Sequence, residues 1–206
     1  MLIRRLLLPA ALLAALVSGL SGCATTGADE APARPNASDQ TDADRRARAR
    51  IELASAYYSR GQMETALDEV RLAVQAKPDL SDAYNLRGLI YSSLGDTALA
   101  ESSFKRALQL RPRDADALHN YGWFLCQQQR FKEAIPQFQA AIEVPQYRGI
   151  ARSFGAKGIC QAQSGLWIEA EGSLMRSFEL DPSNPGTAMN LAEVLYRRAD
   201  YERARF

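Results

Sequence analysis

The fold is decided by the stretch GDTALAESSFKRALQLRP, residues 95–112. Its landmarks are Gly95, Ala100, Phe104, Ala107 and Pro112. The same order of small, apolar and proline residues recurs over residues 61–78, which lie 34 residues earlier, and over 165–182. A variant over 129–145 has glutamine in the glycine place and proline one residue early. Small residues let two helices approach closely, and proline ends a helix because it lacks an N–H donor. The chain therefore reads as a series of helix pairs.

This 34-residue period resembles the tetratricopeptide repeat. The resemblance implies an all-α fold, a tetratricopeptide-repeat solenoid in which antiparallel helix pairs form a right-handed superhelix. We place this domain at residues 46–206, with repeats at about 47–80, 81–114, 115–148, 151–184 and 185–206. The fifth repeat is incomplete, because it stops at Phe206 a few residues into its second helix. We interpret the sequence as truncated there, since a solenoid needs a terminal helix with a polar outer face. The alternative is a natural short final helix.

Small and bulky residues occupy fixed places within the repeats. The eighth position is small in every repeat: Ala54, Gly88, Gly122, Gly158 and Ala192. The fourth, eleventh and twenty-fourth positions of repeats two and three are bulky: Tyr84, Tyr91, Phe104, Leu118, Leu125 and Phe138. We expect these residues to form the core between the first helix (A) and the second helix (B) of each repeat.

Residues 1–22 are typical of an export signal. Arg4 and Arg5 precede an apolar run over residues 6–20 that is too short to span a bilayer. The run ends in Leu20-Ser21-Gly22-Cys23, which resembles the bacterial lipobox. That resemblance implies cleavage before Cys23 and lipidation of this cysteine, and acyl chains would hold the protein on a membrane. The alternative is a plain secretory signal in which the cysteine occurs by chance.

The residue after the lipobox indicates in which membrane the protein is anchored. Aspartate in that place retains lipoproteins of this kind in the inner membrane, so Ala24 implies a lipid anchor in the outer membrane, on its periplasmic face. The segment from Ala24 to about Thr41 is rich in Ala, Pro, Thr, Asp and Gly and has few large apolar residues. We therefore predict that residues 23–45 comprise the lipidated cysteine and a flexible tether.

The composition argues against several function classes. Without Arg4 and Arg5, 23 basic residues face 24 acidic ones, so nothing indicates a nucleic-acid partner. His119 is the sole histidine, and no Ser or Asp stands at a recognisable catalytic spacing to it. The cysteines show no Cys-x-x-Cys spacing, which argues against a zinc site. We expect no catalysis, no metal, no cofactor and no small-molecule substrate.

If Cys23 is lipidated, Cys126 and Cys160 remain as an even pair of cysteines. They fall at position 12 of one A helix and position 10 of the next, and A helices of adjacent repeats pack side by side. In an oxidising compartment we predict a disulfide between them. The alternative is that each cysteine is a small buried apolar residue.

The A helices of such repeats expose positions 2, 5, 9 and 12 on a concave face. Leu89, Trp123 and Ile159 recur at position 9, which predicts an apolar stripe on a wet surface. The full set of predicted groove residues is Ile51, Tyr58, Asn85, Leu89, His119, Trp123 and Ile159. We interpret this set as a protein-binding groove; the alternative is that Trp123 belongs to the core.

One known kind of tetratricopeptide groove does not match this sequence. Chaperone-binding repeats clamp a C-terminal carboxylate with Lys, Asn and Arg side chains. The corresponding places here are Ile51, Ser55, Leu86, Asp116 and Asn120, which are not built for a carboxylate.

A longer resemblance rests on His119-Asn120-Tyr121-Gly122-Trp123-Phe124-Leu125-Cys126-Gln127-Gln128, on Gly158-Ile159-Cys160 and on Asn190-Leu191-Ala192. Together with the lipobox, these runs resemble the PilF/PilW family of type IV pilus biogenesis lipoproteins over essentially the whole chain. The resemblance implies a pilotin, which helps the pilus secretin PilQ to reach the outer membrane and multimerise there. Two other functions use the same scaffold: an adaptor for cell-wall hydrolases and a part of the outer-membrane protein assembly machinery.

Overall fold

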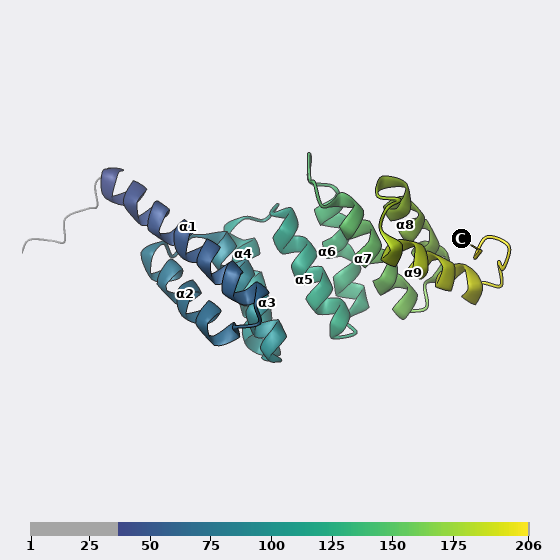
Figure 1. Ribbon diagram of the computed structural model, residues 1–206, viewed down its shortest axis with the longest axis horizontal. Helices are drawn as coiled ribbons and strands as arrows, with labels where there is room; N and C mark the ends of the chain where they lie inside the picture. The colour runs from purple at the N-terminus through teal and green to yellow at the C-terminus, as the bar shows by residue number, and fades with distance from the viewer. Residues whose placement is uncertain (1–36, 206) are drawn as a thin grey trace, which may run out of the picture. The chain divides into compact units, whose positions relative to one another are not determined.

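The computed structural model describes residues 37–205, and every regular element in that range is an α-helix (Figure 1). The A helices are α1 (Ala37–Ser59), α3 (Ser81–Leu94), α5 (Ala115–Gln127), α7 (Ile150–Gln163) and α9 (Pro185–Arg197). The B helices are α2 (Met63–Ala76), α4 (Thr97–Leu110), α6 (Phe131–Ile142) and α8 (Trp167–Leu180). Each A helix from α1 to α7 packs on the B helix that follows it and on the next A helix. This arrangement confirms the all-α helix pairs that the repeat period predicts.

The turns between A and B helices share one backbone conformation. Gly95 lies in the left-handed region with φ of 79°, which suits glycine because it has no Cβ. Gln129 takes the same conformation with φ of 58° in repeat three, so the glutamine of the variant repeat keeps the turn. The B helices then end just before the predicted prolines, at Ala76, Leu110 and Leu180.

The first helix begins earlier than the sequence predicts. Residues 37–45 fall within the predicted tether, yet α1 starts at Ala37. Its first turns carry ion pairs: Asp42 contacts Arg45, and Asp44 lies 2.5 Å from the Lys77 ammonium beyond the end of α2. A contact to the neighbouring helix fixes this segment as helix, which composition alone does not reveal. The lipobox and Cys23 lie outside the described residues.

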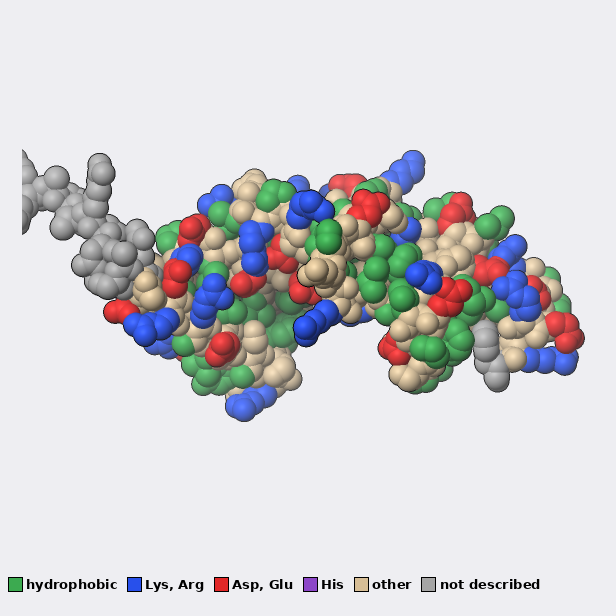
Figure 2. All heavy atoms as spheres, turned by 90° about the horizontal axis from the view of Figure 1, so that it is seen from above, with side chains coloured by type: hydrophobic (Ala, Val, Ile, Leu, Met, Phe, Trp, Pro, Cys, Tyr) green, Lys and Arg blue, Asp and Glu red, His purple; other side chains and the backbone are tan. Residues whose placement is uncertain are grey.

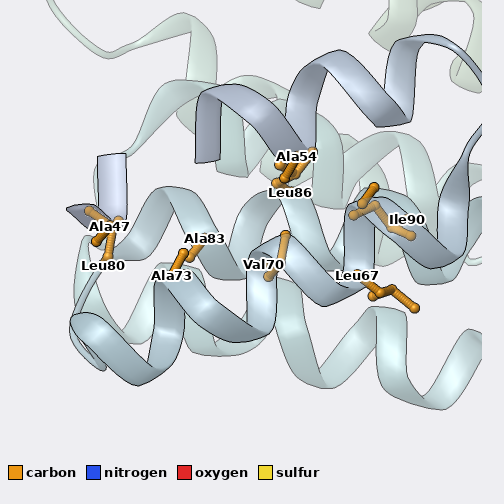
Figure 3. Close-up of a cluster of buried hydrophobic side chains, with 10 residues drawn as sticks. Ala47, Ala54, Leu67, Val70, Ala73, Leu80, Ala83, Leu86 and Ile90 are labelled. Carbon is orange, nitrogen blue, oxygen red and sulfur yellow. The ribbon is translucent and has the colours of Figure 1, made fainter. Parts of the chain in front are cut away.

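Small side chains allow three helices to share one core in the first repeats. Ala47 and Ala54 of α1, Val70 and Ala73 of α2 and Ala83 of α3 are all fully buried in one cluster (Figure 3). Of the predicted bulky core residues, those that are buried are Tyr84, Phe104, Leu118, Leu125 and Phe138. Tyr91 is only half-buried at the edge of the core.

The eighth position is where the two helices of a repeat come closest. A Cβ on Gly158 would lie 2.6 Å from Cγ of Leu174, 3.1 Å from the Leu174 backbone nitrogen and 3.2 Å from the Ala170 carbonyl oxygen. Two of these three atoms are backbone and cannot swing aside. Gly122 is less confined, because the nearest atoms to its Cβ would be those of the Phe138 ring at 3.1 Å.

The fifth repeat differs from its prediction. Helix α9 ends at Arg197, and residues 201–204 form turns rather than the beginning of a second helix. Within residues 37–205, no helix has both the length and the apolar character that a membrane crossing needs.

We expect Gly158→Ala to lower the free energy of unfolding by about 1–2 kcal/mol, because overpacking outweighs the better helix propensity of alanine. Gly172, on the exposed face of α8, is the matched control, since nothing lies within 4 Å of its Cβ position. Gly172→Ala should raise stability by about 0.5–1 kcal/mol. Denaturant melts of the two variants measure both effects, and equal stabilisation by both would show that Gly158 is not a site of close approach.

Candidate functional site

A pocket of about 340 Å³ lies among the A helices of repeats three, four and five. His119, Trp123 and Ile159, three of the predicted groove residues, all line it. The remaining lining residues come from α7, the end of α8 and the start of α9: Arg152, Gly155, Ala156, Ser177, Asn184, Gly186, Thr187 and Asn190. An apolar wall therefore stands beside amide and hydroxyl groups, which is the usual make-up of a ligand pocket.

His119 is more deeply buried than a groove residue should be. Its side chain is 7% exposed, and its Nδ1 lies 2.8 Å from Oγ of Ser153. Burial, assisted by the positive charge of Arg152, lowers the pKa of His119 to about 4. A neutral imidazole at the bottom of the pocket corrects the prediction of an exposed polar residue beside the stripe.

Ser153 is the partner of His119, and the sequence alone did not reveal it. The two residues are 34 apart, so they lie on neighbouring A helices and face each other in the α5–α7 contact. Although a Ser–His pair is a catalytic motif elsewhere, the Ser153 hydroxyl is fully buried. A substrate cannot reach it, and the pair serves to join the two helices.

The loop between α6 and α7, where repeats three and four are spaced by 36 residues rather than 34, places a tyrosine beside this contact. The Tyr147 hydroxyl lies 3.2 Å from the Arg152 guanidinium and 3.4 Å from Oγ of Ser153. Arg152 in turn forms an ion pair with Asp116 at 2.9 Å. Arg152 and Asp116 both occupy position 2 of their repeats, so the repeat register was the signal that would have found them.

The remaining predicted groove residues do not share this pocket. Ile51 lines a separate recess near Leu80, and the Tyr58 hydroxyl lies 3.3 Å from Oγ of Ser93. Asn85 accepts a hydrogen bond of 3.1 Å from Asn120. Leu89 and Trp123 both pack, partly buried, against the core cluster that includes Phe104 and Phe124. The predicted groove is therefore divided: Asn85 lines a separate pocket of about 840 Å³, and only His119, Trp123 and Ile159 share the pocket described above.

A disulfide joins Cys126 of α5 to Cys160 of α7, with Cα atoms 5.8 Å apart. Both sulfurs are buried beneath the groove. Closing a loop of 34 residues stabilises a fold by about 3–4 kcal/mol in the chain-entropy description. The bond fixes the two A helices that carry Trp123 and Ile159.

Acidic and basic side chains are mixed on one face of the molecule. Figure 2 shows acidic and basic side chains interspersed over the visible face rather than gathered into one patch. Among the described residues, no group of three or more His, Cys, Asp or Glu side chains is arranged to hold a metal ion.

Comparison with known proteins places this geometry in a family. The tetratricopeptide-repeat family model matches residues 33–81 and 85–148. The type IV pilus assembly protein PilF of Pseudomonas aeruginosa is 30% identical over 196 residues, which cover 95% of this chain and 76% of that protein. The chain belongs to the PilF/PilW-like tetratricopeptide-repeat proteins.

Solved structures agree with this assignment. The structure of Pseudomonas aeruginosa PilF matches with a TM-score of 0.77 at 29% identity, covering 80% of this chain and 74% of that one. PilW, described as a widely conserved type IV pilus biogenesis factor, matches with a TM-score of 0.73 at 30% identity, covering 77% and 72%. This PilF/PilW-like chain is thus a tetratricopeptide-repeat solenoid of type IV pilus biogenesis.

The sole histidine of this PilF/PilW-like chain gives its stability a pH dependence. The pKa of His119 is about 4 when folded, below the roughly 6.5 of an unfolded histidine. The free energy of unfolding is therefore highest above pH 6.5 and falls as the pH drops toward 4, because in that range only the unfolded state takes up the proton. Between pH 7 and pH 5.5 we expect a loss of about 1 kcal/mol.

Denaturant melts at pH 7 and pH 5.5 test this, with His119→Gln as the control that should lose the dependence in that range. A wild-type chain that is equally stable at both pH values would contradict the buried neutral imidazole.

Proposed function

We propose that this chain is a pilotin, a lipid-anchored outer-membrane adaptor that binds the type IV pilus secretin and promotes its localisation and multimerisation, and hence pilus assembly. The observation that carries the proposal is the pocket that joins Trp123 and Ile159 to the amide groups of α9. An apolar wall with polar neighbours suits a segment of another protein, because aromatic anchors in such pockets supply much of the binding energy.

The family membership supports the pilotin proposal over the two alternatives, an adaptor for cell-wall hydrolases and a part of the outer-membrane protein assembly machinery. PilF and PilW are both named for type IV pilus assembly or biogenesis. The scaffold also supports a non-catalytic role, because Ser153, the partner of His119, is buried in the α5–α7 contact and does not line the pocket. Protein binding, without a cofactor, is the function that we assign to the groove.

The proposed anchor is Cys23, at the end of the run Leu20-Ser21-Gly22-Cys23. Acylation there would keep the repeats at the periplasmic face of the outer membrane, where a secretin must assemble. A membrane-bound adaptor needs only modest affinity, because tethering raises the effective concentration of its partner.

We expect Cys23→Ser to release the chain from the outer membrane or to leave its signal uncleaved, and to reduce the amount of secretin multimer. Membrane flotation and an immunoblot for secretin multimers measure these effects. If the variant still floats with outer membranes and supports full multimer levels, the lipid anchor is not at this cysteine.

We expect Trp123→Ala to weaken secretin binding by at least tenfold, since truncation of an aromatic anchor typically costs about 2–4 kcal/mol. The measurement is a titration of the full-length protein in detergent with the purified secretin, alongside a thermal melt. Trp167→Ala is the matched control, because Trp167 is partly exposed at the start of α8, away from the pocket. A lower melting temperature with unchanged affinity would make Trp123 a core residue, and absence of binding by the wild type would overturn the proposed function.

A further inference from the structure

A second pocket, of about 600 Å³, shares Trp123 with the pocket around Ile159. The other lining residues come from the ends of α5 and α7 and the beginning of α6: Cys126, Gln127, Gln129, Phe131 and Gln163. We call it the glutamine pocket.

The chemistry of the glutamine pocket is uncharged. Within the described part of the chain, its lining consists of two aromatic side chains, one disulfide cysteine and three glutamines. Arg130 and Lys132 flank Phe131 in the sequence, but neither lines the pocket. The Arg130 guanidinium instead bonds Glu101 and Glu133 at 2.7 Å each. An ionised group entering here would lose water without gaining an opposite charge.

The disulfide gives the pocket its base. Cys126 lines it directly, and the bond to Cys160 fixes the end of α5 against α7. Gln127, Gln129 and Gln163 are exposed at its rim, while Trp123 and Phe131 are partly buried. A glutamine amide both donates and accepts hydrogen bonds, so it can satisfy either half of a peptide group.

We propose that the glutamine pocket is a second half of the docking site, and that it takes an uncharged, extended segment of the partner protein that passes over Trp123 from the pocket around Ile159. An apolar side chain of that segment lies against Trp123 and Phe131, and the glutamines bond its backbone. The continuity of both pockets through Trp123 selects a polypeptide as the occupant. This inference rests on the proposed function, and it adds the chemical character of the bound segment.

The test is a charge introduced at the rim. Gln163→Glu, measured on the full-length protein in detergent with the purified secretin, should weaken binding at least tenfold, because a carboxylate would face peptide carbonyls and lose solvation. Gln163→Ala removes one amide without adding charge and should weaken binding about threefold. Gln128→Glu is the matched control, since Gln128 is exposed one residue along and does not line the pocket. It should bind within twofold of the wild type.

The outcomes separate the two proposals. If the wild type binds the secretin and Gln163→Glu binds it equally well, the glutamine pocket is not part of the docking site, while the proposed function stands. If the wild type does not bind the secretin, both proposals fall. Sedimentation of the protein with purified peptidoglycan, abolished by Gln163→Glu, would assign the pocket to a glycan instead and overturn the inference.

Discussion

The close approach of two helix backbones in each repeat is the constraint on which the rest of this structure depends. At Gly158 the A helix lies so near to α8 that even a methyl group would meet the backbone of Ala170 and Leu174. Because the pair is this tight, Leu174 of α8, which lies against Gly158, is almost completely buried. Tight pairs then stack with their A helices adjacent, and adjacency brings Trp123, Ile159 and Thr187 to one pocket.

Much of this fold could be predicted from the sequence, because the information is local. The turn residues, the prolines and the small eighth position each act within one repeat, and their period reveals the helix pairs. The beginning of α1 could not be predicted in the same way. Its first turns are held by contacts such as that of Asp44 with Lys77, 33 residues away, which composition does not record.

The candidate site shows a similar limit. The repeat register placed Trp123 and Ile159 on one face, but it did not show that His119 turns inward to Ser153, or that Leu89 and Trp123 both pack, partly buried, against one core cluster. Register fixes the face of a helix that a residue occupies. How much of each side chain stays exposed depends on its neighbours, and here the Tyr147 hydroxyl lies beside Arg152.

The disulfide between α5 and α7 has a consequence for how the molecule opens. A stack of repeats unfolds by losing units from its ends, because each unit contacts only its neighbours. Cys126–Cys160 joins the third and fourth repeats into a single cooperative block, so fraying from either side stops there. The first repeat can open and close many times while the glutamine pocket, whose lining residues all lie between Trp123 and Gln163, keeps its shape. A chain that binds a partner through this pocket would thus keep that surface formed while its first repeat opens.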